Sequence, residues 1–306
     1  MLKLMRSILR KIPLWVAFQE LRREGLGNAY KRLRIQKKVL DTAPMHLDSE
    51  GDVEVHVLTW RKDYINLIWS LKTFYALSEK RFPLVIHDGG LHNRHKHILL
   101  KHFPEARIID KTLADKEVGD FLEEMGLSKS KEYRLTNVAS LKLFDYKHYS
   151  SAKRIIHIDS DIVFFKKPTE FLDYIDDSLS VFNKDMNYAY SIAPTALEEL
   201  VGEHVPHLIN SGLFIVDVES LNLELTEMCL NQSAELFSNK WVTEQTLHAI
   251  CATKYGYQFL SKDYLISTHR GLPEDIVCKH YTGFFRPLFY QEGLHEVVDR
   301  KVLDFL

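Results

Sequence analysis

The sequence predicts an α/β protein whose central sheet is largely parallel. Short apolar segments rich in β-branched residues alternate with longer helical ones, the pattern of buried strands joined by helices. Polar and acidic side chains directly follow several of the short segments, where ligands bind in parallel sheets. The expected strands are residues 53–58, 83–87, 106–109 and 155–158, and the expected helices are residues 65–77, 92–103, 111–127 and 136–149.

The second half of the chain differs in character from the first. Residues 185–193 are expected to form a loop or a strand, and the apolar run 213–216 a further buried strand. A helix is expected to begin near Trp241, with Thr243 as its N-terminal cap. The remaining expected elements are helices at residues 171–177 and 219–237 and a strand at residues 257–260.

Length and composition narrow the class of protein. A chain of 306 residues suits one large α/β domain with an appendage, or two small domains. It is 45% hydrophobic and 27% charged, and its formal net charge of −2 gives no general case for nucleic-acid binding. Three cysteines form no Cys-x-x-Cys pair and are odd in number, which predicts reduced thiols in a cytoplasmic protein.

No membrane span or signal peptide is expected. No apolar run approaches the roughly 20 residues that a spanning helix needs. The first apolar pieces are interrupted by Arg6, Arg10, Lys11 and Pro13, and no small-residue cleavage site follows them.

The positive charge gathers at the N-terminus. Residues 1–40 hold eleven Lys or Arg and two Glu, a net of +9, whereas the remainder has 29 basic and 40 acidic residues, a net of −11. Basic residues beside Trp15, Phe18 and several leucines are the pattern of an interfacial helix on an anionic membrane. The alternative is a helix that packs on its own domain and turns a basic face to solvent. Residues 1–44 are thus predicted to be a basic helical arm and residues 45–306 the main domain.

Two carboxylates follow the buried strand at residues 155–158. Asp159 and Asp161 are one residue apart, and the chain is apolar again directly afterwards. Such carboxylates are costly to desolvate unless something pairs with them. Both can turn toward one hard cation, and Mg²⁺ or Mn²⁺ would suit them together with a phosphate ligand. The alternative is a strand that ends in a solvated turn, where aspartate is common.

Other polar residues occupy the same kind of position. Thr59, Asp63 and Asp88 all fall at or just beyond the ends of expected strands. Because ligands bind beyond the carboxyl ends of strands in parallel sheets, these positions strengthen the prediction of a site there.

Four pieces stand in a fixed order along the chain. They are an apolar strand ending in Asp-Ser-Asp, Asn-Ser-Gly before a strand, Glu-Gln at a helix start, and His-x-x-Gly-x-x-Arg-Pro near the end. Together they resemble the GT-A glycosyltransferases, most closely glycosyltransferase family 8, the group of glycogenin and the lipopolysaccharide galactosyltransferases. The resemblance covers about residues 52–290 and implies the Rossmann-like GT-A fold.

The resemblance implies a metal site and a diphosphate site. Asp159 and Asp161 correspond to the metal-binding pair of the family, and His280 to its third protein ligand. Gly283 would let the backbone approach the diphosphate. Arg286 stands where the family usually has Lys, which keeps the charge and adds bidentate phosphate geometry. Leu288 stands where the family often has Trp.

The resemblance also implies residues that bind the rest of the donor. The loop after the first strand holds the nucleotide base, a basic position upstream of the Asp pair contacts the donor, and further candidates lie at strand ends. These residues are Thr59, Asp63, Tyr64, Asp88, Lys142 and Ser160. Asn210 and Gln245 match positions near the donor sugar. Glu244 replaces the family's Asp, and its extra methylene leaves its role open.

The implied activity is metal-dependent transfer of a sugar from a nucleotide-diphosphate donor, most plausibly a UDP-sugar, with retention. The cation and Arg286 would stabilise charge on the diphosphate leaving group. An amide or carboxylate on the donor face would support an oxocarbenium-like sugar. The acceptor is expected to be a glycan, a lipid-linked molecule or another acceptor, with peripheral contact to the cytosolic membrane face through the basic arm.

Two other functions remain open from the sequence. Asp159-Ser-Asp-Ile-Val163 fits the motif of haloacid-dehalogenase-type phosphohydrolases, in which Asp159 would be the nucleophile. That motif normally opens its domain, however, whereas about a hundred residues of β/α structure precede it here. The second alternative is a catalytically silent nucleotide-binding protein of the same fold.

Overall fold

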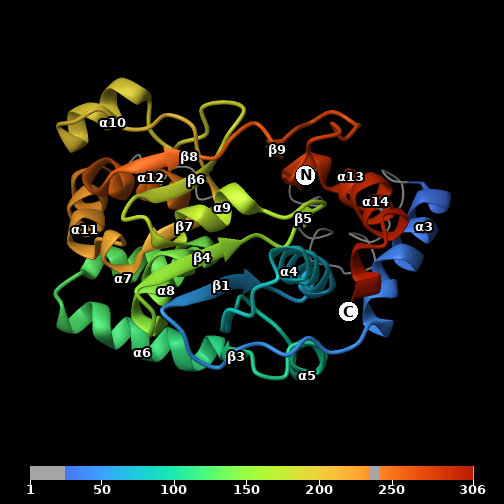
Figure 1. Ribbon diagram of the computed structural model, residues 1–306. Coiled ribbons are helices and arrows are strands. Elements are labelled where there is room, and N and C mark those ends of the chain that lie inside the picture. The colour runs from blue at the N-terminus through green and yellow to red at the C-terminus, as the bar shows by residue number, and fades with distance from the viewer. Residues whose placement is uncertain (1–24, 234–241, 306) are drawn as a thin grey trace, which may run out of the picture.

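Strands form two sheets in the computed structural model, which describes residues 25–233 and 242–305 (Figure 1). The strands are β1 (Val53–Thr59), β2 (Leu84–Asp88), β3 (Arg107–Ile109), β4 (Arg154–Ile158), β5 (Ile162–Phe164), β6 (Ser180–Lys184), β7 (Ile209–Asp217), β8 (Tyr257–Phe259), β9 (Tyr264–Ile266) and β10 (Cys278–His280). The larger sheet has the order β3-β2-β1-β4-β7-β6-β8, and the smaller one β5-β10-β9.

The larger sheet is mostly parallel, as predicted. Strands β3, β2, β1 and β4 run parallel to one another, and β8 runs parallel to β6. Only β7 is reversed, since it pairs antiparallel with both β4 and β6. The four strands expected in the first half of the chain all occur, with bounds shifted by at most one residue. The predicted α/β class is therefore confirmed.

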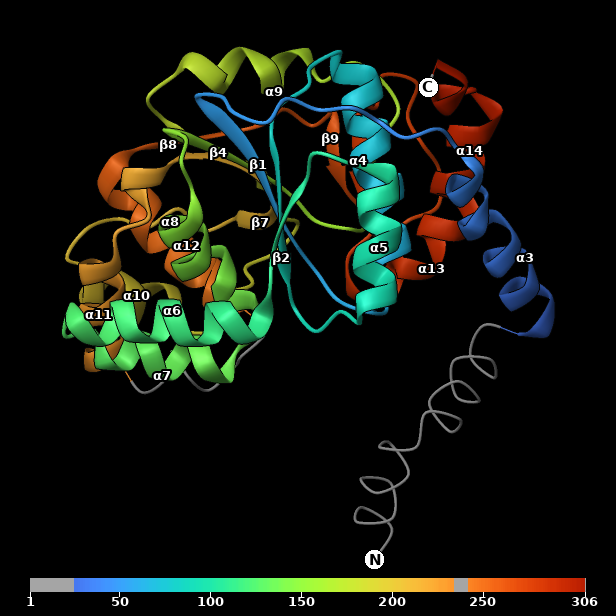
Figure 2. The ribbon, with the colours of Figure 1, turned by 90° about the horizontal axis from the view of Figure 1, so that it is seen from below.

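Helices cover both faces of this sheet. Their bounds are α3 (Leu26–Lys37), α4 (Tyr64–Ser78), α5 (Asn93–His102), α6 (Lys111–Glu124), α7 (Ser128–Thr136), α8 (Phe144–Tyr149), α9 (Thr169–Asp173), α10 (Pro194–Val201), α11 (Leu223–Gln232), α12 (Thr243–Tyr255), α13 (Arg286–Leu288) and α14 (Leu294–Asp299). Helices α3, α4, α5, α13 and α14 lie to one side of the sheet, and α6, α7, α8, α11 and α12 lie to the other (Figure 2).

Alternate side chains of each strand enter different hydrophobic cores. Ile156 and Ile158 of β4 pack in the core that contains Trp69 of α4. Ile155 between them faces the opposite way and packs in the core that contains Phe144 of α8. This alternation follows from the two-residue period of a strand, so β4 buries isoleucines on both of its faces.

The smaller sheet brings the C-terminal part of the chain to the end of β4. Strand β5 begins only four residues after β4 ends, and β10 pairs with it antiparallel. In this register His280 lies opposite Ile162, the residue after Asp161. The backbone N–H of Tyr281 donates to the carbonyl oxygen of Asp161 at 3.0 Å. Pairing in the small sheet therefore places His280 beside Asp161.

The expected helix at residues 136–149 is wrong as a single element. Helix α7 ends at Thr136, a 3-10 helix spans Val138–Lys142, and α8 follows. Asn137 between them is extended, with φ −136° and ψ 113°, and its side chain accepts from the N–H of Ala139. Asparagine side chains compete for backbone groups in this way, which interrupts helices. Lys142 therefore lies at the end of a short 3-10 helix.

Two further expectations on the second half need correction. The helix expected at residues 219–237 is helical over Leu223–Gln232, after a 3-10 turn at Val218–Ser220, and residues 234–237 lie outside the described residues. Thr243 is the first residue of α12 and not its cap, because Val242 occupies the cap position without a side-chain hydrogen bond. Trp241, where this helix was expected to begin, also lies outside the described residues.

The described part of the predicted basic arm packs on the domain. Helix α3 lies beside α14 in both ribbon views (Figures 1 and 2), and Ile35 and Val39 are buried in the core that contains Trp69. The indole N–H of Trp69 donates to the carbonyl oxygen of Gln36 at 2.8 Å. Residues 1–24 of the arm lie outside the described residues. Among the described helices, none has the length and apolar character that crossing a bilayer requires.

All three cysteines are buried and unpaired: Cys229, Cys251 and Cys278. Reduced thiols are what the sequence predicted.

Candidate functional site

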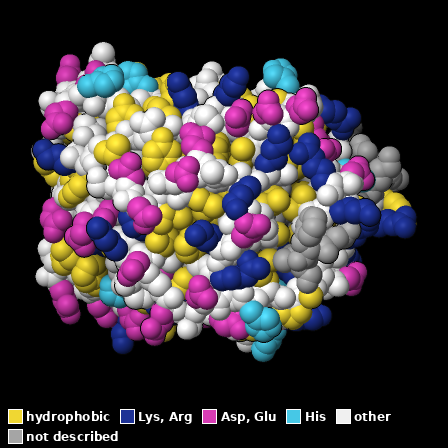
Figure 3. Space-filling view, in the orientation of Figure 1, with side chains coloured by type: hydrophobic (Ala, Val, Ile, Leu, Met, Phe, Trp, Pro, Cys, Tyr) yellow, Lys and Arg dark blue, Asp and Glu magenta, His cyan; other side chains and the backbone are white. Residues whose placement is uncertain are grey.

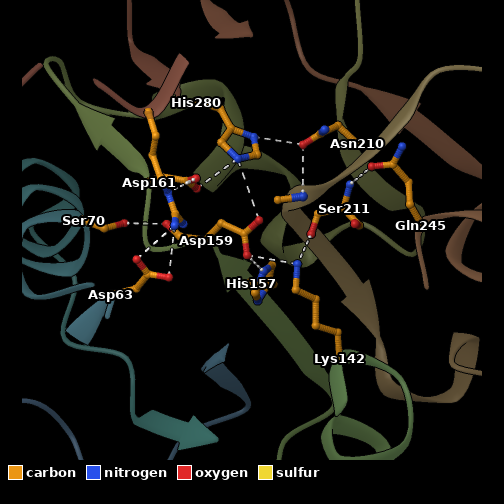
Figure 4. A network of polar contacts seen from close by, with 12 residues as sticks. Asp63, Ser70, Lys142, His157, Asp159, Asp161, Asn210, Ser211, Gln245 and His280 are labelled. Carbon is orange, nitrogen blue, oxygen red and sulfur yellow. Dashed lines mark hydrogen bonds and ion pairs between the residues drawn. The ribbon is translucent and has the colours of Figure 1, made fainter. Parts of the chain in front are cut away.

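Asp159 and Asp161 lie where the central strand of the large sheet gives way to the small sheet. The backbone N–H of Asp159 still bonds the carbonyl oxygen of Gly212 on β7, at 2.7 Å. The Ser70 hydroxyl on α4 donates to the carbonyl oxygen of Asp159 at 3.0 Å. Hydrogen bonds to the backbone thus fix the positions of both Asp159 and Asp161. Both side chains turn to the same side (Figure 4).

His280 completes a group of three metal-ligating side chains. Its Nε2 lies 3.2 Å from Oδ1 of Asp161 and 3.8 Å from Oδ2 of Asp159. One ligand atom from each of the three residues lies within 4.8 Å of the others. Nδ1 of His280 lies 3.0 Å from Oδ1 of Asn210, which orients the ring (Figure 4). Two residues separated from His280 by more than a hundred positions therefore share one small volume with it.

Gly212 is required by the close approach of His280. A Cβ atom at this position would lie 2.2 Å from Cε1 of the His280 ring and 2.7 Å from its Nδ1. No side chain fits at such distances, so glycine lets β7 and β10 hold the imidazole between them. In the Asn-Ser-Gly string, Gly212 leaves room for the His280 ring, and the side chain of Asn210 orients it.

Lys142 and His157 both contact Asp159. Lys142 Nζ lies 3.0 Å from Oδ1 of Asp159 and donates to the carbonyl oxygen of Ser211 at 3.0 Å. His157 Nε2 lies 3.0 Å from the same Oδ1. Burial raises the pKa of Asp159, but Lys142 and then His157 outweigh it and hold that pKa well below the ordinary value. Asp159 is therefore a carboxylate at neutral pH.

Arg286 joins Asp161 to the loop after β1. Its Nε lies 3.1 Å from Oδ2 of Asp161, and its Nη1 lies 3.0 and 3.2 Å from the two oxygens of Asp63. Burial raises the pKa of Asp161, whereas His280 and Arg286 lower it, and the net direction is down. Burial opposes the charge of Arg286 as well, but Asp161 and Asp63 raise its pKa further above the ordinary value. We call Asp159, Asp161, His280, Lys142 and Arg286 the strand-end cluster.

Polar side chains from β7 and α12 border this cluster. Gln245 Oε1 accepts from the N–H of Ser211 at 3.2 Å, and its Nε2 donates to the carbonyl oxygen of Ala189 at 3.0 Å. Glu244 Oε2 accepts from the Ser211 hydroxyl at 2.8 Å. The amide of Asn210 donates to Oδ2 of Asp185 at 3.0 Å. These bonds hold the two amides and the carboxylate in fixed orientations.

A cavity of about 380 Å³ opens in front of these residues, and we call it the strand-end cavity. All of the predicted site residues except Tyr64 and Asp88 line it. They are Thr59, Asp63, Lys142, Asp159, Ser160, Asp161, Asn210, Glu244, Gln245, His280, Gly283 and Arg286. Gly283 has φ 49°, a left-handed conformation that favours glycine.

Tyr64 and Asp88 have other surroundings. The Tyr64 ring, at the first residue of α4, stacks on the His95 ring with centroids 4.4 Å apart. Asp88 Oδ1 accepts from the N–H of Gly90 at 2.7 Å, and its Oδ2 lies 2.7 Å from Lys96 Nζ. Asp88 thus stabilises the turn after β2 and does not line the cavity.

Several residues that the structure brings to this site were not predicted from the sequence. His157 precedes Asp159 by two residues and so points to the same side of the chain, which the period of a strand could have indicated. Asp185 binds Asn210 from the loop after β6, and no local signal marked it. Further cavity-lining residues that were not predicted include Trp60, Asn137, Ser211 and Thr282.

The strand-end cluster fits a divalent cation. Two carboxylates and one imidazole are ligands that Mn²⁺ and Mg²⁺ accept together with phosphate oxygens. Lys142 and Arg286 add two positive charges beside the cluster, which suits a polyanionic ligand in the same cavity. The arrangement can therefore hold a metal ion and a diphosphate side by side.

Comparisons with known proteins bear on the fold. No protein-family model matches the sequence, and no curated protein matches it. The structure is similar to that of the galactosyltransferase LgtC solved with donor and acceptor sugar analogues, at a TM-score of 0.55 and 10% identity. The alignment covers 81% of this chain and 94% of that chain.

Two further solved structures align at a lower TM-score of 0.48. They are mouse xyloside xylosyltransferase 1, at 12% identity over 75% of this chain and 97% of that chain, and the mannosyltransferase Ktr4p from S. cerevisiae, at 12% identity over 76% and 77%. At these identities a likeness establishes the fold alone. The predicted resemblance is confirmed at that level: the chain has the GT-A glycosyltransferase fold, similar to that of a family 8 galactosyltransferase.

Proposed function

We propose that this protein is a metal-dependent glycosyltransferase that moves a sugar from a nucleotide-diphosphate donor to an acceptor. The observation that carries the proposal is the convergence of Asp159, Asp161 and His280 within 4.8 Å, at the end of the central strand of a GT-A fold. Carboxylates in such a place need a positive partner. The strand-end cavity beside them has the cations and the volume for a diphosphate.

Asp159, Asp161 and His280 would hold Mn²⁺ or Mg²⁺, which when bound offsets negative charge on the diphosphate. Arg286 would contribute to the same end from the protein side. Its Nε and Nη1 bind Asp161 and Asp63, and within the described residues no partner occupies Nη2. That nitrogen is available to a phosphate oxygen. Lys142 holds Asp159 in its ionised form and adds positive charge to the cavity.

Asn210 and Gln245 would face the donor sugar. Both amides are oriented by hydrogen bonds to neighbouring residues, so their position at the cavity is set before the sugar binds. We assign retaining transfer on the family resemblance, with Gln245 on the sugar side. Gln245→Ala should lower turnover far more than donor affinity, and NMR of the first product would reveal inversion at the anomeric carbon if the assignment is wrong.

The donor is proposed to be a UDP-sugar, and the acceptor a glycan or a lipid-linked molecule. A screen of nucleotide sugars with Mn²⁺ should raise the melting temperature for the true donor, since a ligand that binds only the folded state stabilises it. The same donor should then be hydrolysed slowly or transferred in a metal-dependent way. The same assay compares two variants. Asp159→Asn removes a proposed metal ligand, and Asp48→Asn, at an exposed site that does not line the cavity, is its matched control.

Activity and melting measurements also test the two alternative functions, a phosphohydrolase and a catalytically silent nucleotide-binding protein. A phosphohydrolase with Asp159 as nucleophile would release phosphate from p-nitrophenyl phosphate, and Asp159→Asn would abolish that release. A silent nucleotide-binding protein would show thermal stabilisation by nucleotides but no turnover of any donor. In the structure Oδ1 of Asp159 contacts Lys142 and His157, and Oδ2 faces His280. Both oxygens are therefore engaged with positive or proton-donating groups, which favours the metal-ligand role.

We further propose that residues 1–44 are an arm that carries residues 45–306 to an anionic membrane surface on the cytosolic side. The described part supports this by its charge: Arg32, Arg34 and Lys38 line a cavity of about 600 Å³ between α3 and α14, together with Arg270 and Asp299 of the main domain. Lys and Arg side chains gather on this side of the molecule (Figure 3). Each basic residue that lies near anionic lipid contributes about 1 kcal/mol to the free energy of membrane binding.

Vesicle co-sedimentation tests this contact. The full chain should bind anionic vesicles and be released at high salt, because salt screens the attraction. A chain that begins at Gly25 should bind more weakly. This chain keeps residues 25–44, because Ile35 and Val39 belong to the core and their removal would destabilise the fold. Equal binding of both chains would mean that residues 1–24 do not contact the membrane.

A further inference from the structure

Glu198, His204 and His207 form a second group of metal-ligating side chains, and none of them lines the strand-end cavity. Glu198 lies on α10, and the two histidines lie in the connection from α10 to β7. Oε1 of Glu198 is 2.6 Å from Nδ1 of His204 and 3.2 Å from Nε2 of His207. One ligand atom of each residue lies within 4.8 Å of the other two.

The local backbone explains why these residues meet. Gly202 ends α10 in a left-handed conformation with φ 76°, and its N–H bonds the carbonyl oxygen of Glu198 at 2.7 Å. The chain therefore reverses and returns His204 to Glu198. Val205 is fully buried next to it, which anchors the connection to the core between the two histidines.

The second histidine is also held in place. The ring of His207 packs edge-on against Tyr188, with centroids 5.8 Å apart. The Tyr190 hydroxyl bonds the backbone on both sides of this residue, at the carbonyl oxygen of Pro206 and, at 2.9 Å, the N–H of Ile209. His207 thus sits on a backbone fixed by hydrogen bonds.

Two imidazoles and one carboxylate are a donor set that suits Zn²⁺ and leaves one position for water. Bonds of about 2.0–2.2 Å in a tetrahedron place ligand atoms roughly 3.3 Å apart. The 3.2 Å separation already matches this spacing, and the 2.6 Å separation needs only a small side-chain rotation. Glu199 and Glu203 line the hollow beside His204 and add negative charge. Histidine and acidic side chains lie together over α10 in the space-filling view (Figure 3).

We propose that Glu198, His204 and His207 bind a zinc ion, separate from the cation of the strand-end cluster. The bound ion would close the connection at residues 202–208 onto α10. That connection leads into β7 and Asn210, and the carbonyl oxygen of Leu208 accepts from the N–H of Asp185 at 2.7 Å. The zinc ion would therefore stabilise residues 202–208, which lead into the strand that lines the strand-end cavity.

Zinc titration by calorimetry on the chelator-treated full chain tests the proposal. Because Zn²⁺ also binds carboxylate and imidazole ligands of the strand-end cluster, the test compares stoichiometries. The variant His204→Ala/His207→Ala should bind one zinc equivalent fewer than the wild type. The matched variant His97→Ala/His295→Ala, which removes two exposed histidines elsewhere, should bind as many as the wild type.

Two more measurements make the outcome decisive. Zn²⁺ should raise the melting temperature of the wild type by more than that of His204→Ala/His207→Ala, while both melt alike without metal. Co²⁺ should give the strong visible absorption of a four-coordinate site in the wild type, and Glu198→Gln should weaken it. Equal zinc stoichiometry and equal melting shifts in the wild type and His204→Ala/His207→Ala would overturn the proposal and leave only surface ion pairs.

Discussion

The strand-end cluster and a second buried ion cluster, on α6, α7 and α8, use the same residue types to different ends. In the second cluster the Arg134 guanidinium forms a bidentate pair with Asp145, with both distances 2.9 Å, and its Nη1 lies 2.6 Å from Asp115. Arg134 and Asp145 are fully buried, and neither borders the strand-end cavity. In the strand-end cluster the charged groups line that cavity and are shared among several partners.

The pKa directions show the same contrast. Burial raises the pKa of Asp145 to about 6, although Arg134 acts against it. Asp159 is buried too, yet Lys142 and His157 hold its pKa below the ordinary value. At Asp145 burial therefore outweighs Arg134, whereas at Asp159 the charge of Lys142 and the hydrogen bond from His157 outweigh burial. Charged groups that line a cavity can exchange partners for a ligand, whereas a closed bidentate pair serves only the fold.

The largest effect is expected from breaking the closed pair. Arg134→Leu should lower the free energy of unfolding by about 3–5 kcal/mol, because it leaves Asp145 buried without its partner. Urea denaturation measures this. The double variant Arg134→Leu/Asp145→Leu should recover much of the loss. Glu132→Gln, in the exposed pair with Lys129, should stay within about 1 kcal/mol of the wild type. If Arg134→Leu lowered the free energy of unfolding only slightly, the Arg134–Asp145 pair would not have the structural role that distinguishes it from the strand-end cluster.

The second effect concerns activity and not stability. Asp161→Asn keeps the side-chain volume and should lower metal-dependent turnover by about 10²–10³-fold, comparable to removing one charge-stabilising group. Its free energy of unfolding should change much less than that of Arg134→Leu, because Arg286 retains Asp63. Initial rates with saturating donor and metal measure the loss, with Asp48→Asn as the control. Full activity in Asp161→Asn would remove this carboxylate from the proposed site.

A smaller effect is expected from Gly212→Ala. The added methyl group would displace the His280 ring, whose Cε1 would lie 2.2 Å away. Affinity for Mn²⁺ should fall by about 10–100-fold, the range seen when the orientation of a metal ligand is disturbed. Gly119→Ala in α6 is a fair control, since its nearest contact would be an ordinary 3.7 Å. Unchanged metal affinity in Gly212→Ala would show that the position of His280 is not critical.

The smallest effect concerns pH at the other end of β1. Glu54 accepts hydrogen bonds from His56, Ser150 and Ser151. Burial raises its pKa, but these bonds and the charge of His56 lower it from 4.5 to about 2. The carboxylate thus stabilises the fold above pH about 4.5, and this contribution is lost as the pH falls toward 2. Wild-type stability should therefore fall more than that of Glu54→Gln between pH 5 and 2 in urea titrations. Parallel curves would contradict this.

Much of the architecture follows from local patterns in the sequence. Strands such as β1 and β4 can be located because β-branched apolar residues recur in them, at every second position from Val53 to Val57 in β1 and at Ile155, Ile156 and Ile158 in β4. Short interruptions are harder to find. Asn137 interrupts the helix expected at residues 136–149, where its side chain accepts from the N–H of Ala139, and periodicity over many residues does not detect such a local bond.

Local patterns in the sequence were enough to predict the α/β class, the place of Asp159 and Asp161 after a buried strand, and the segregation of basic residues at the N-terminus. These are local properties, since composition and periodicity act over a few neighbouring residues. The family resemblance implied that His280 meets these carboxylates, but the contact itself depends on the tertiary structure. The antiparallel register of β10 with β5 places His280 beside Asp161, and Gly212 leaves room for its ring. Contacts across more than a hundred residues depend on how sheets pair and pack, and no local pattern encodes that pairing by itself.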